Sequence, residues 1–196
     1  MARPADPQRR ETILRAATEL FTEQGYSDTR LVDIAKRARV VVSTLYLYFP
    51  SKEEMVRAIA SDIQQQVLSE LRPVLEHLHS EADIARLVEV VCAFAHEHGD
   101  AIRIFNLDSG LRGVRMGIRA TQGPRIQQGI EVLTGLMEAG YLRPYDPDNL
   151  VDVLIATVRW IVSKCLALEE DERELEPFKR FCAQWLCHAL LPVSPA

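Results

Sequence analysis

The spacing of apolar residues predicts helices along nearly the whole chain. Apolar side chains recur every three or four positions, which places them on one face of a helix. The expected helices cover residues 7–24, 30–38, 42–48, 51–73, 82–98, 100–108, 125–139, 148–169 and 174–191. Glycine and proline gather mainly at 4–7, 110–124 and 140–147 and leave long stretches between them. This distribution favours an all-α fold over many short strands.

One segment is ambiguous by itself, because three consecutive valines at 40–42 are followed by aromatic residues, a composition typical of a strand. No second strand candidate lies nearby in the sequence. Leu45 and Phe49 stand four positions apart, which suits a short helix packed on its neighbours. Ser51 then provides an N-cap, and Glu54 completes a capping box for the next helix. We therefore expect a helix in this segment.

The helices at 30–38 and 42–48 are short and are joined by a tight turn, and these are the dimensions of a helix-turn-helix. In such a unit the second helix enters the major groove of DNA, and its N-terminal residues meet the base edges. The side chains expected to face outward from that helix are Val42, Ser43, Thr44, Tyr46, Leu47 and Tyr48. The pattern therefore indicates DNA binding through these residues.

The outward side chains differ in what they can offer to DNA. Ser43 and Thr44 carry hydroxyls for bases or phosphates. Val42 and Leu47 offer only apolar contact, for instance to a thymine methyl group. The side chains suited to phosphate oxygens are Arg30, Tyr46, Tyr48 and Lys52. The alternative for both tyrosines is a place in the core, but they fall off the apolar stripe of this helix.

The sequence D-I-A-K-R-A, followed by T-L-Y-L-Y-F-P-S-K-E-E-M, resembles the DNA-binding signature of the TetR (tetracycline-repressor-type) family of bacterial transcription regulators. The resemblance covers about residues 8–56. It implies an all-α protein with an N-terminal three-helix helix-turn-helix DNA-binding domain over 1–50. A larger C-terminal helical domain for ligand binding and dimerisation would cover 51–196. The residues that it implies as DNA contacts are Tyr46 and Lys52 for phosphates and Val42, Ser43, Thr44 and Tyr48 on the recognition helix.

Two residues in the expected turn depart from the family's pattern. Arg39 stands where the family usually has a glycine, so a side chain is expected near the left-handed region at a cost of about 1 kcal/mol. Val41 stands where the family usually has a serine that caps the recognition helix, and an apolar cap forgoes roughly 0.5–2 kcal/mol. Neither departure removes the motif.

The resemblance also implies a cavity for a small-molecule effector among the central helices. The candidate lining residues are Phe94, Phe105, Met137 and Trp160. A helical core would contain the same residue types for packing alone, so both interpretations stay open. Arg112, Arg115 and Arg119 would form a basic stripe on a helix and could hold an anion such as an acyl-coenzyme A. The alternative is a solvated face paired with acidic residues of the same domain.

The helices at 148–169 and 174–191 carry more apolar surface than one chain can cover. Pairing them with the same helices of a second copy about a two-fold axis would form a four-helix interface. The residues expected at that interface are Leu154, Val158, Ile161, Phe178, Phe181 and Trp185. We therefore expect a homodimer.

The distribution of charge modifies this picture. The formal net charge of −5 and the pI of about 5.6 argue, taken for the whole chain, against a nucleic-acid partner. The total hides an asymmetry, because residues 1–60 hold ten Lys and Arg against eight Asp and Glu, whereas residues 61–196 hold thirteen against twenty. We therefore expect DNA affinity to come from a few side chains and helix N-termini within residues 1–60. A dimer would present each of these groups twice.

Other kinds of chemistry find little support in the sequence. No apolar run reaches the roughly 18–20 residues of a membrane span and no signal-peptide core precedes the first helix, so a cytoplasmic protein without a membrane partner is expected. The four cysteines form no C-x-x-C pair and are expected as buried thiols. His96 and His98 would point about 200° apart on a helix and cannot hold one metal ion together. No catalytic constellation or nucleotide fingerprint is present, so we expect no enzyme activity, metal or cofactor.

These observations favour a ligand-responsive repressor that binds a roughly palindromic double-stranded DNA operator as a homodimer and responds to an unidentified small-molecule effector. One alternative is a constitutive DNA-organising protein of the same fold without an effector, which a collapsed cavity would support. The other is a catalytic or metal-binding helical protein.

Overall fold

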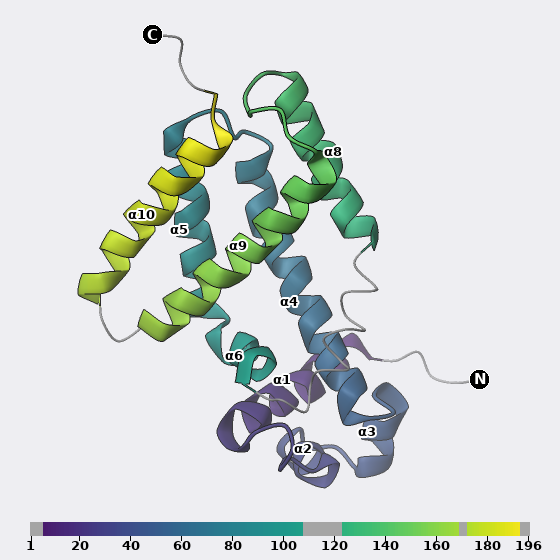
Figure 1. Ribbon diagram of the computed structural model, residues 1–196. Helices are drawn as coiled ribbons and strands as arrows, with labels where there is room; N and C mark the ends of the chain where they lie inside the picture. Colours follow the sequence, from purple (N-terminus) through teal and green to yellow (C-terminus); the bar gives the residue numbers. More distant parts are fainter. Residues whose placement is uncertain (1–5, 108–122, 169–171, 193–196) are drawn as a thin grey trace. The chain divides into compact units, whose positions relative to one another are not determined.

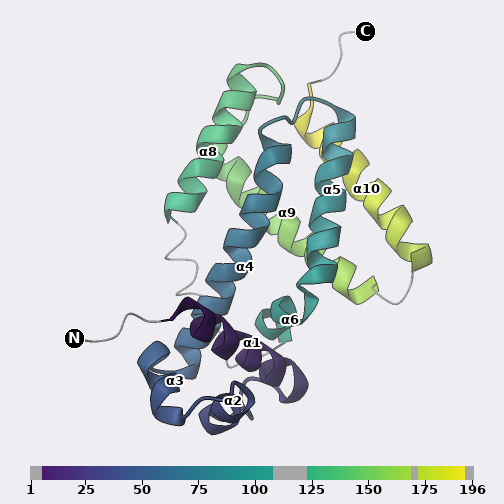
Figure 2. The same cartoon turned by 180° about the vertical axis from the view of Figure 1, so that it is seen from behind.

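The computed structural model describes residues 6–107, 123–168 and 172–192, and every regular element in these ranges is an α-helix (Figures 1 and 2). The helices are α1 (Pro7–Gln24), α2 (Leu31–Arg37), α3 (Val42–Tyr48), α4 (Lys52–Leu75), α5 (Glu81–Glu97), α6 (Gly99–Leu107), α8 (Gly123–Glu138), α9 (Pro147–Leu168) and α10 (Glu172–Leu190). The predicted all-α fold is confirmed. No helix in the described ranges combines the length and the apolar character needed to cross a membrane.

The helix ends in the first part of the chain follow local sequence signals. α1 ends at Gly25, which has a φ of 86° and whose N–H donates to the Phe21 carbonyl at 3.0 Å. The Ser51 hydroxyl accepts a hydrogen bond of 3.3 Å from the Glu54 N–H, as expected for the start of α4. α4 then continues two residues beyond Pro73. Both the predicted left-handed stop at Gly25 and the predicted cap at Ser51 are confirmed.

By its internal contacts the described chain forms two compact units. The first consists of residues 6–65 with 100–107, and the second consists of residues 66–99 with 123–168 and 172–192. The first unit thus extends beyond residue 50, where the sequence placed the end of the DNA-binding domain. The chain passes from the first unit to the second within α4.

The first unit is built around one apolar core, which explains this extension. Its buried side chains include Ile13, Ala17 and Phe21 of α1, Ile34 and Ala35 of α2, Leu45 of α3, Met55, Val56 and Ile59 of α4 and Ile104 of α6. Each large apolar side chain buried in this way contributes about 1.5–3 kcal/mol relative to an exposed one. Because three residues of α4 lie in this core, the start of α4 belongs with the helix-turn-helix.

The second unit is a bundle centred on α5, which packs against both α9 and α10, while α8 packs against α9. Figure 1 shows α5 and α10 running side by side, with α9 crossing in front of α5. The helices meet through aliphatic side chains that are buried, among them Val88 and Val91 of α5, Ile161 of α9 and Leu186 of α10. This bundle carries the region in which the sequence predicted effector binding and dimerisation.

Three of the four cysteines are buried in the second unit, as expected, and Cys187 is half-buried. The Cys92 and Cys165 thiols share a hydrogen bond, with their sulfurs 2.9 Å apart, and Cys182 is buried as well. The hydrogen bond to Cys165 and burial raise the pKa of the Cys92 thiol. At neutral pH this thiol therefore stays protonated and unreactive.

We expect Leu45→Ala to lower the free energy of unfolding by about 2–5 kcal/mol, because Leu45 is buried and its truncation leaves a cavity. Leu47→Ala removes the same atoms from a side chain of α3 that is 84% exposed, and should change stability by less than about 0.5 kcal/mol. Urea unfolding followed by circular dichroism measures both variants. Equal losses in the two would contradict this orientation of α3.

Candidate DNA-binding interface

The turn between α2 and α3 is a Schellman motif. The Val40 N–H donates to the Ala35 carbonyl at 2.9 Å, and the Arg39 N–H donates to the Lys36 carbonyl at 3.2 Å. Arg39 occupies the left-handed position of the motif with a φ of 55°. The predicted left-handed conformation of Arg39 is confirmed, and it costs about 1 kcal/mol relative to a glycine in that conformation.

α3 begins without a side-chain cap. Its N-cap residue is Val41, which has an extended backbone and contributes no cap hydrogen bond, as the sequence predicted. The Val41 side chain is exposed. It therefore adds an apolar group at the N-terminal end of the recognition helix, where base contacts are made. Sequence reasoning treated this residue only as a poor cap, although its place directly before the helix makes it a candidate contact as well.

α3 turns an apolar residue inward and a mixed set of residues outward. Leu45 is fully buried, whereas Tyr46 is 51% and Leu47 is 84% exposed. Ser43 is exposed as well, and Thr44 is half-buried. The accessible face of α3 therefore offers a hydroxyl, a phenol and an isobutyl group to a partner.

Two of the residues predicted to contact DNA lie partly in the core. Val42 and Tyr48 are half-buried and pack against the core of the first unit. The Tyr48 hydroxyl accepts a hydrogen bond of 3.0 Å from the Asp6 N–H. A hydroxyl that accepts in this way can still donate its proton to a phosphate oxygen. Tyr48 therefore ties the end of α3 to the start of α1.

Lys52, predicted as a phosphate contact, is engaged inside the protein. Its ammonium donates to the carbonyls of Tyr26 at 2.7 Å and Thr29 at 2.8 Å, and to that of Ser27 at 3.3 Å. It also lies 4.5 Å from the centroid of the Tyr26 ring, in a cation–π contact. The three N–H donors of a lysine thus match three carbonyls. The structure gives this side chain an internal role that the sequence pattern did not indicate.

The remaining predicted phosphate contact, Arg30, is the N-cap residue of α2, where its side chain is exposed and makes no cap hydrogen bond. Arg37, at the other end of α2, binds both carboxylate oxygens of Glu23 at 2.8–2.9 Å and one of Glu19 at 3.1 Å. The hydrogen bond from Arg37 lowers the pKa of Glu23. The Arg37 charge is therefore paired with carboxylates of α1. The exposed Arg30 side chain is better placed to meet an anion.

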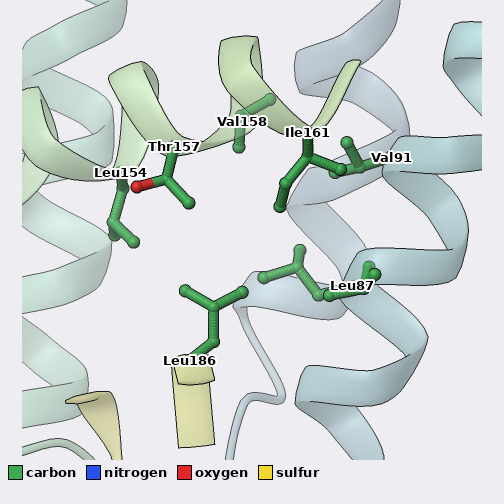
Figure 3. A pocket seen from close by; sticks show the side chains of 8 residues that line it. Leu87, Val91, Leu154, Thr157, Val158, Ile161 and Leu186 are labelled. Atoms are coloured by element: carbon green, nitrogen blue, oxygen red, sulfur yellow. The ribbon is translucent and has the colours of Figure 1, made fainter. Parts of the chain in front are cut away.

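A small apolar cavity lies between α5, α9 and α10 in the second unit (Figure 3). Its volume is about 20 Å³, which holds about one water molecule. It is lined by Leu87, Val88 and Val91 of α5, by Leu154, Thr157, Val158 and Ile161 of α9 and by Leu186 of α10. A larger ligand could occupy this place only if the three helices moved apart.

The residues expected to line an effector cavity lie elsewhere in the second unit. Phe94 is buried in α5 with its ring 4.3 Å from that of His98. Met137 is half-buried, and its sulfur accepts a hydrogen bond of 3.3 Å from the Tyr145 N–H. Trp160 is 50% exposed. None of these three expected residues lines the cavity. The Phe105 side chain and Arg112, Arg115 and Arg119 lie outside the described residues.

Aromatic side chains form a face on α9 and α10, and we call Trp160, Phe178, Phe181 and Trp185 the aromatic face. Phe178 is half-buried and the other three are exposed. The ring of Trp160 meets that of Phe178 edge-on, with centroids 5.3 Å apart. Phe181 is 57% and Trp185 is 46% exposed. Large apolar patches on a protein surface are typical of interaction sites.

Three residues expected at a dimer interface line the cavity between α5, α9 and α10. Leu154, Val158 and Ile161 line the cavity, Ile161 is buried, and the other two are half-buried. The reason is that α9 is apolar on two sides, of which one packs against α5 and the other is exposed. Periodicity alone does not tell the two sides apart, and it is Trp160, rather than Ile161, that lies on the aromatic face.

Among the described residues, one group could offer ligands to a metal ion. Glu70 of α4 and Glu97 and His98 at the end of α5 place their ligand atoms within 4.8 Å of one another. Both carboxylates are exposed, and exposed acidic groups also gather in this way without an ion. The cluster by itself therefore does not define a metal centre.

The short α2 and α3, their tight turn and the exposed side of α3 define a helix-turn-helix DNA-binding protein. Residues 13–59 match the family described as bacterial regulatory proteins, tetR family. The chain is 27% identical over 154 residues to the HTH-type transcriptional regulator RutR of Escherichia coli (strain K12), covering 77% of this chain and 72% of RutR. It belongs to the TetR family and is a DNA-binding transcriptional regulator.

Solved structures share the fold over nearly the whole chain. The fatty acid degradation regulator FadR from Bacillus halodurans superposes with a TM-score of 0.75 at 20% identity, covering 94% of this chain and 96% of that one. The transcriptional regulator FadR from Bacillus subtilis in complex with stearoyl-CoA gives a TM-score of 0.71 at 19% identity, covering 90% and 96%. At these identities the likeness shows the shared fold alone.

We expect Val41→Ser to raise the free energy of unfolding by about 0.5–2 kcal/mol, because a serine hydroxyl at the N-cap accepts a hydrogen bond from an otherwise unpaired N–H of α3. Val32→Ser is the matched control, since Val32 is also exposed but lies within α2, where a hydroxyl cannot act as the N-cap. Thermal and urea unfolding measure both. A gain no larger than in the control would contradict the N-cap assignment.

Proposed function

We propose that this protein is a ligand-responsive repressor that binds a roughly palindromic DNA operator as a homodimer. The proposal rests on the orientation of α3. Leu45 is buried and anchors the helix, and Ser43, Tyr46 and Leu47 are exposed. A helix presented in this way fits a major groove roughly 12 Å wide. In a repressor, occupation of such a site excludes other proteins from the same DNA.

The exposed groups suggest how the operator is contacted. Arg30 and Tyr46 contact phosphates and hold the register, and Ser43 and Thr44 hydroxyls reach base edges or phosphates. Leu47 offers apolar contact to a thymine methyl group. Few hydrogen bonds to bases are available from this face, so phosphate contacts and DNA shape contribute a large share of the affinity.

DNA binding is assigned to residues 1–50, and dimerisation and effector binding are assigned to residues 51–196. The aromatic face supports self-association, because aromatic side chains are enriched at protein interfaces and are costly to leave in water. Pairing α9 and α10 with the same helices of a second copy forms a four-helix interface. Two recognition helices then meet half-sites about 34–36 Å apart, or somewhat more.

The proposed effector is an apolar small molecule that enters between α5, α9 and α10. The side chains around the cavity support an apolar ligand, because all eight are aliphatic except Thr157. The FadR structure from Bacillus subtilis, which has the same fold, is a complex with stearoyl-CoA, whose acyl chain is apolar. A coupling of about 1–3 kcal/mol between effector and DNA is enough to weaken operator binding 5- to 150-fold.

A constitutive DNA-binding protein without an effector is the second candidate, and the volume of the cavity, about 20 Å³, favours it. The two candidates differ in the response to long-chain acyl-coenzyme A. A ligand that raises the melting temperature and releases operator DNA supports the repressor. DNA binding that stays unchanged with acyl chains of every length supports the constitutive protein. Both functions require access to the chromosome, which assigns the protein to the cytoplasm.

Fluorescence anisotropy with duplex DNA from upstream of the protein's own gene tests the proposed DNA binding. We expect sequence-preferring binding whose affinity falls roughly 1,000-fold between 50 and 200 mM salt if the dimer neutralises six phosphates. Leu47→Ala should weaken binding to the operator but not to scrambled DNA, because it removes an apolar contact in the groove. Equal affinity of the unaltered protein for operator and scrambled DNA at low salt would refute the proposal.

Phe181→Asp should convert the dimer to a monomer, because it places a carboxylate on the aromatic face, where dimerisation would bury it. Sedimentation velocity distinguishes the chain mass of 22.2 kDa from twice that mass. Leu68→Asp changes an exposed leucine of α4 outside the aromatic face and should leave the dimer intact. Dissociation in both variants, or a monomer before any substitution, would argue against this interface.

A further inference from the structure

A groove in the first unit lies between the start of α1 and the turn that joins α2 to α3. Its volume is about 230 Å³. One water molecule needs only about 10–15 Å³ of such a volume, so the groove has room for a polar group of a ligand. The polar side chains that line it are those of Asp6, Gln8, Arg9, Thr12 and Arg39. We call it the turn groove, and all its lining residues lie within the first unit.

The lining of the turn groove has an excess of positive charge. The side chains of Arg9 and Arg39 are both exposed. Among the described residues neither guanidinium has an ion-pair partner, whereas Arg10 and Arg37 pair with carboxylates. The Asp6 carboxylate carries the opposing charge, and it accepts a hydrogen bond of 3.1 Å from the Gln8 N–H as the N-cap of α1. The groove is therefore suited to an anion.

The backbone of Arg39 adopts a conformation that glycine reaches more easily. Its φ is 55°, and the turn is held by hydrogen bonds from the Arg39 N–H to the Lys36 carbonyl at 3.2 Å and from the Val40 N–H to the Ala35 carbonyl at 2.9 Å. A β-carbon adds a steric cost in this left-handed region that glycine does not incur. A residue held in such a conformation is a reason to seek a role for its side chain outside folding.

Arg39 also lies where a helix-turn-helix approaches the DNA backbone. It stands two residues before Val41, the N-cap of α3. The N-terminal residues of the recognition helix meet base edges while the preceding helix crosses the backbone, so the turn between the two helices lies beside phosphates. A guanidinium can donate two parallel hydrogen bonds to one phosphate. The Tyr48 hydroxyl accepts a hydrogen bond of 3.0 Å from the Asp6 N–H, which holds the start of α1 next to α3.

We propose that Arg39, together with Arg9, forms a site for a backbone phosphate of DNA in the turn groove, in addition to the phosphates met by Arg30 and Tyr46. The inference rests on the proposed binding of α3 to DNA. Arg39 then lowers the stability of the turn and raises the affinity for DNA. A phosphate contact carries no base information, so the site strengthens binding to every sequence alike.

Arg39→Gly tests the proposal directly, because the two expected effects have opposite signs. The melting temperature should rise by about 2–4 °C, since glycine removes the steric cost at the left-handed position. Affinity for operator and for scrambled DNA should both fall about tenfold with the loss of a charged hydrogen bond. The slope of log Kd against log salt, measured by fluorescence anisotropy, should fall by about one per subunit.

Arg39→Ala is the matched comparison, because it removes the guanidinium and keeps a β-carbon. It should lose the same affinity and slope as Arg39→Gly without the gain in melting temperature. Arg9→Ala should lower the slope as well. Arg10→Ala is the control, since Arg10 neighbours Arg9 on α1 but pairs with Asp62 at 3.1 Å, and this variant should leave the slope unchanged.

Unchanged affinity and slope in both Arg39 variants would overturn the inference and leave Arg39 a residue of the turn alone. A free phosphate offers the same chemistry, so thermal unfolding in sodium phosphate, against sodium chloride of equal ionic strength, is the second arm. A stabilisation by phosphate that Arg39→Ala abolishes, with an unchanged DNA slope, would overturn the assignment to DNA. Failure of the proposed function is a different result, in which the unaltered protein does not prefer operator over scrambled DNA, and the slopes on either DNA still decide the role of Arg39.

Discussion

The shared apolar core of the first unit is the constraint on which the DNA-binding surface depends. α3 has seven residues, which is too short to be stable as an isolated helix, so burial must hold it in place. Leu45 and Phe49 supply that burial. Once Leu45 is inside, the period of the helix leaves Tyr46 and Leu47 on the outside. The side chain that anchors the recognition helix therefore also decides which of its residues can meet DNA.

The same core allows the turn before α3 to carry two unfavourable residues. Arg39 adopts a left-handed conformation and Val41 fails to cap α3, and together these features cost a few kcal/mol. Burial of apolar side chains on both sides of the turn, from Ile34 and Ala35 to Leu45, offsets that cost. The helix-turn-helix geometry is thus imposed mainly by packing, and local preferences in the turn are secondary to it.

The number of basic residues overstates how many basic side chains this protein has available for DNA. The first sixty residues have only a slight excess of basic side chains. Arg37 is further neutralised by Glu19 and Glu23, and Lys52 is directed at carbonyls of its own chain. Electrostatic attraction is therefore concentrated at few positions, of which Arg30 is the clearest. Affinity for DNA therefore depends on how accurately α2 places Arg30.

The sequence by itself determined the all-α class, the helix-turn-helix and the stop at Gly25, because each of these depends on residues within a few positions of one another. The left-handed Arg39 was implied by the resemblance to the TetR family, which usually has a glycine there. The sequence also identified Ser43, Tyr46 and Leu47 as exposed on α3, but not the partial burial of Val42 and Tyr48. Only the tertiary structure decided that Lys52 binds the Tyr26 carbonyl and that Ile161 faces a cavity rather than solvent. Both outcomes depend on partners distant along the chain. A side chain's local pattern shows that it is cationic or apolar, but packing determines which group it meets.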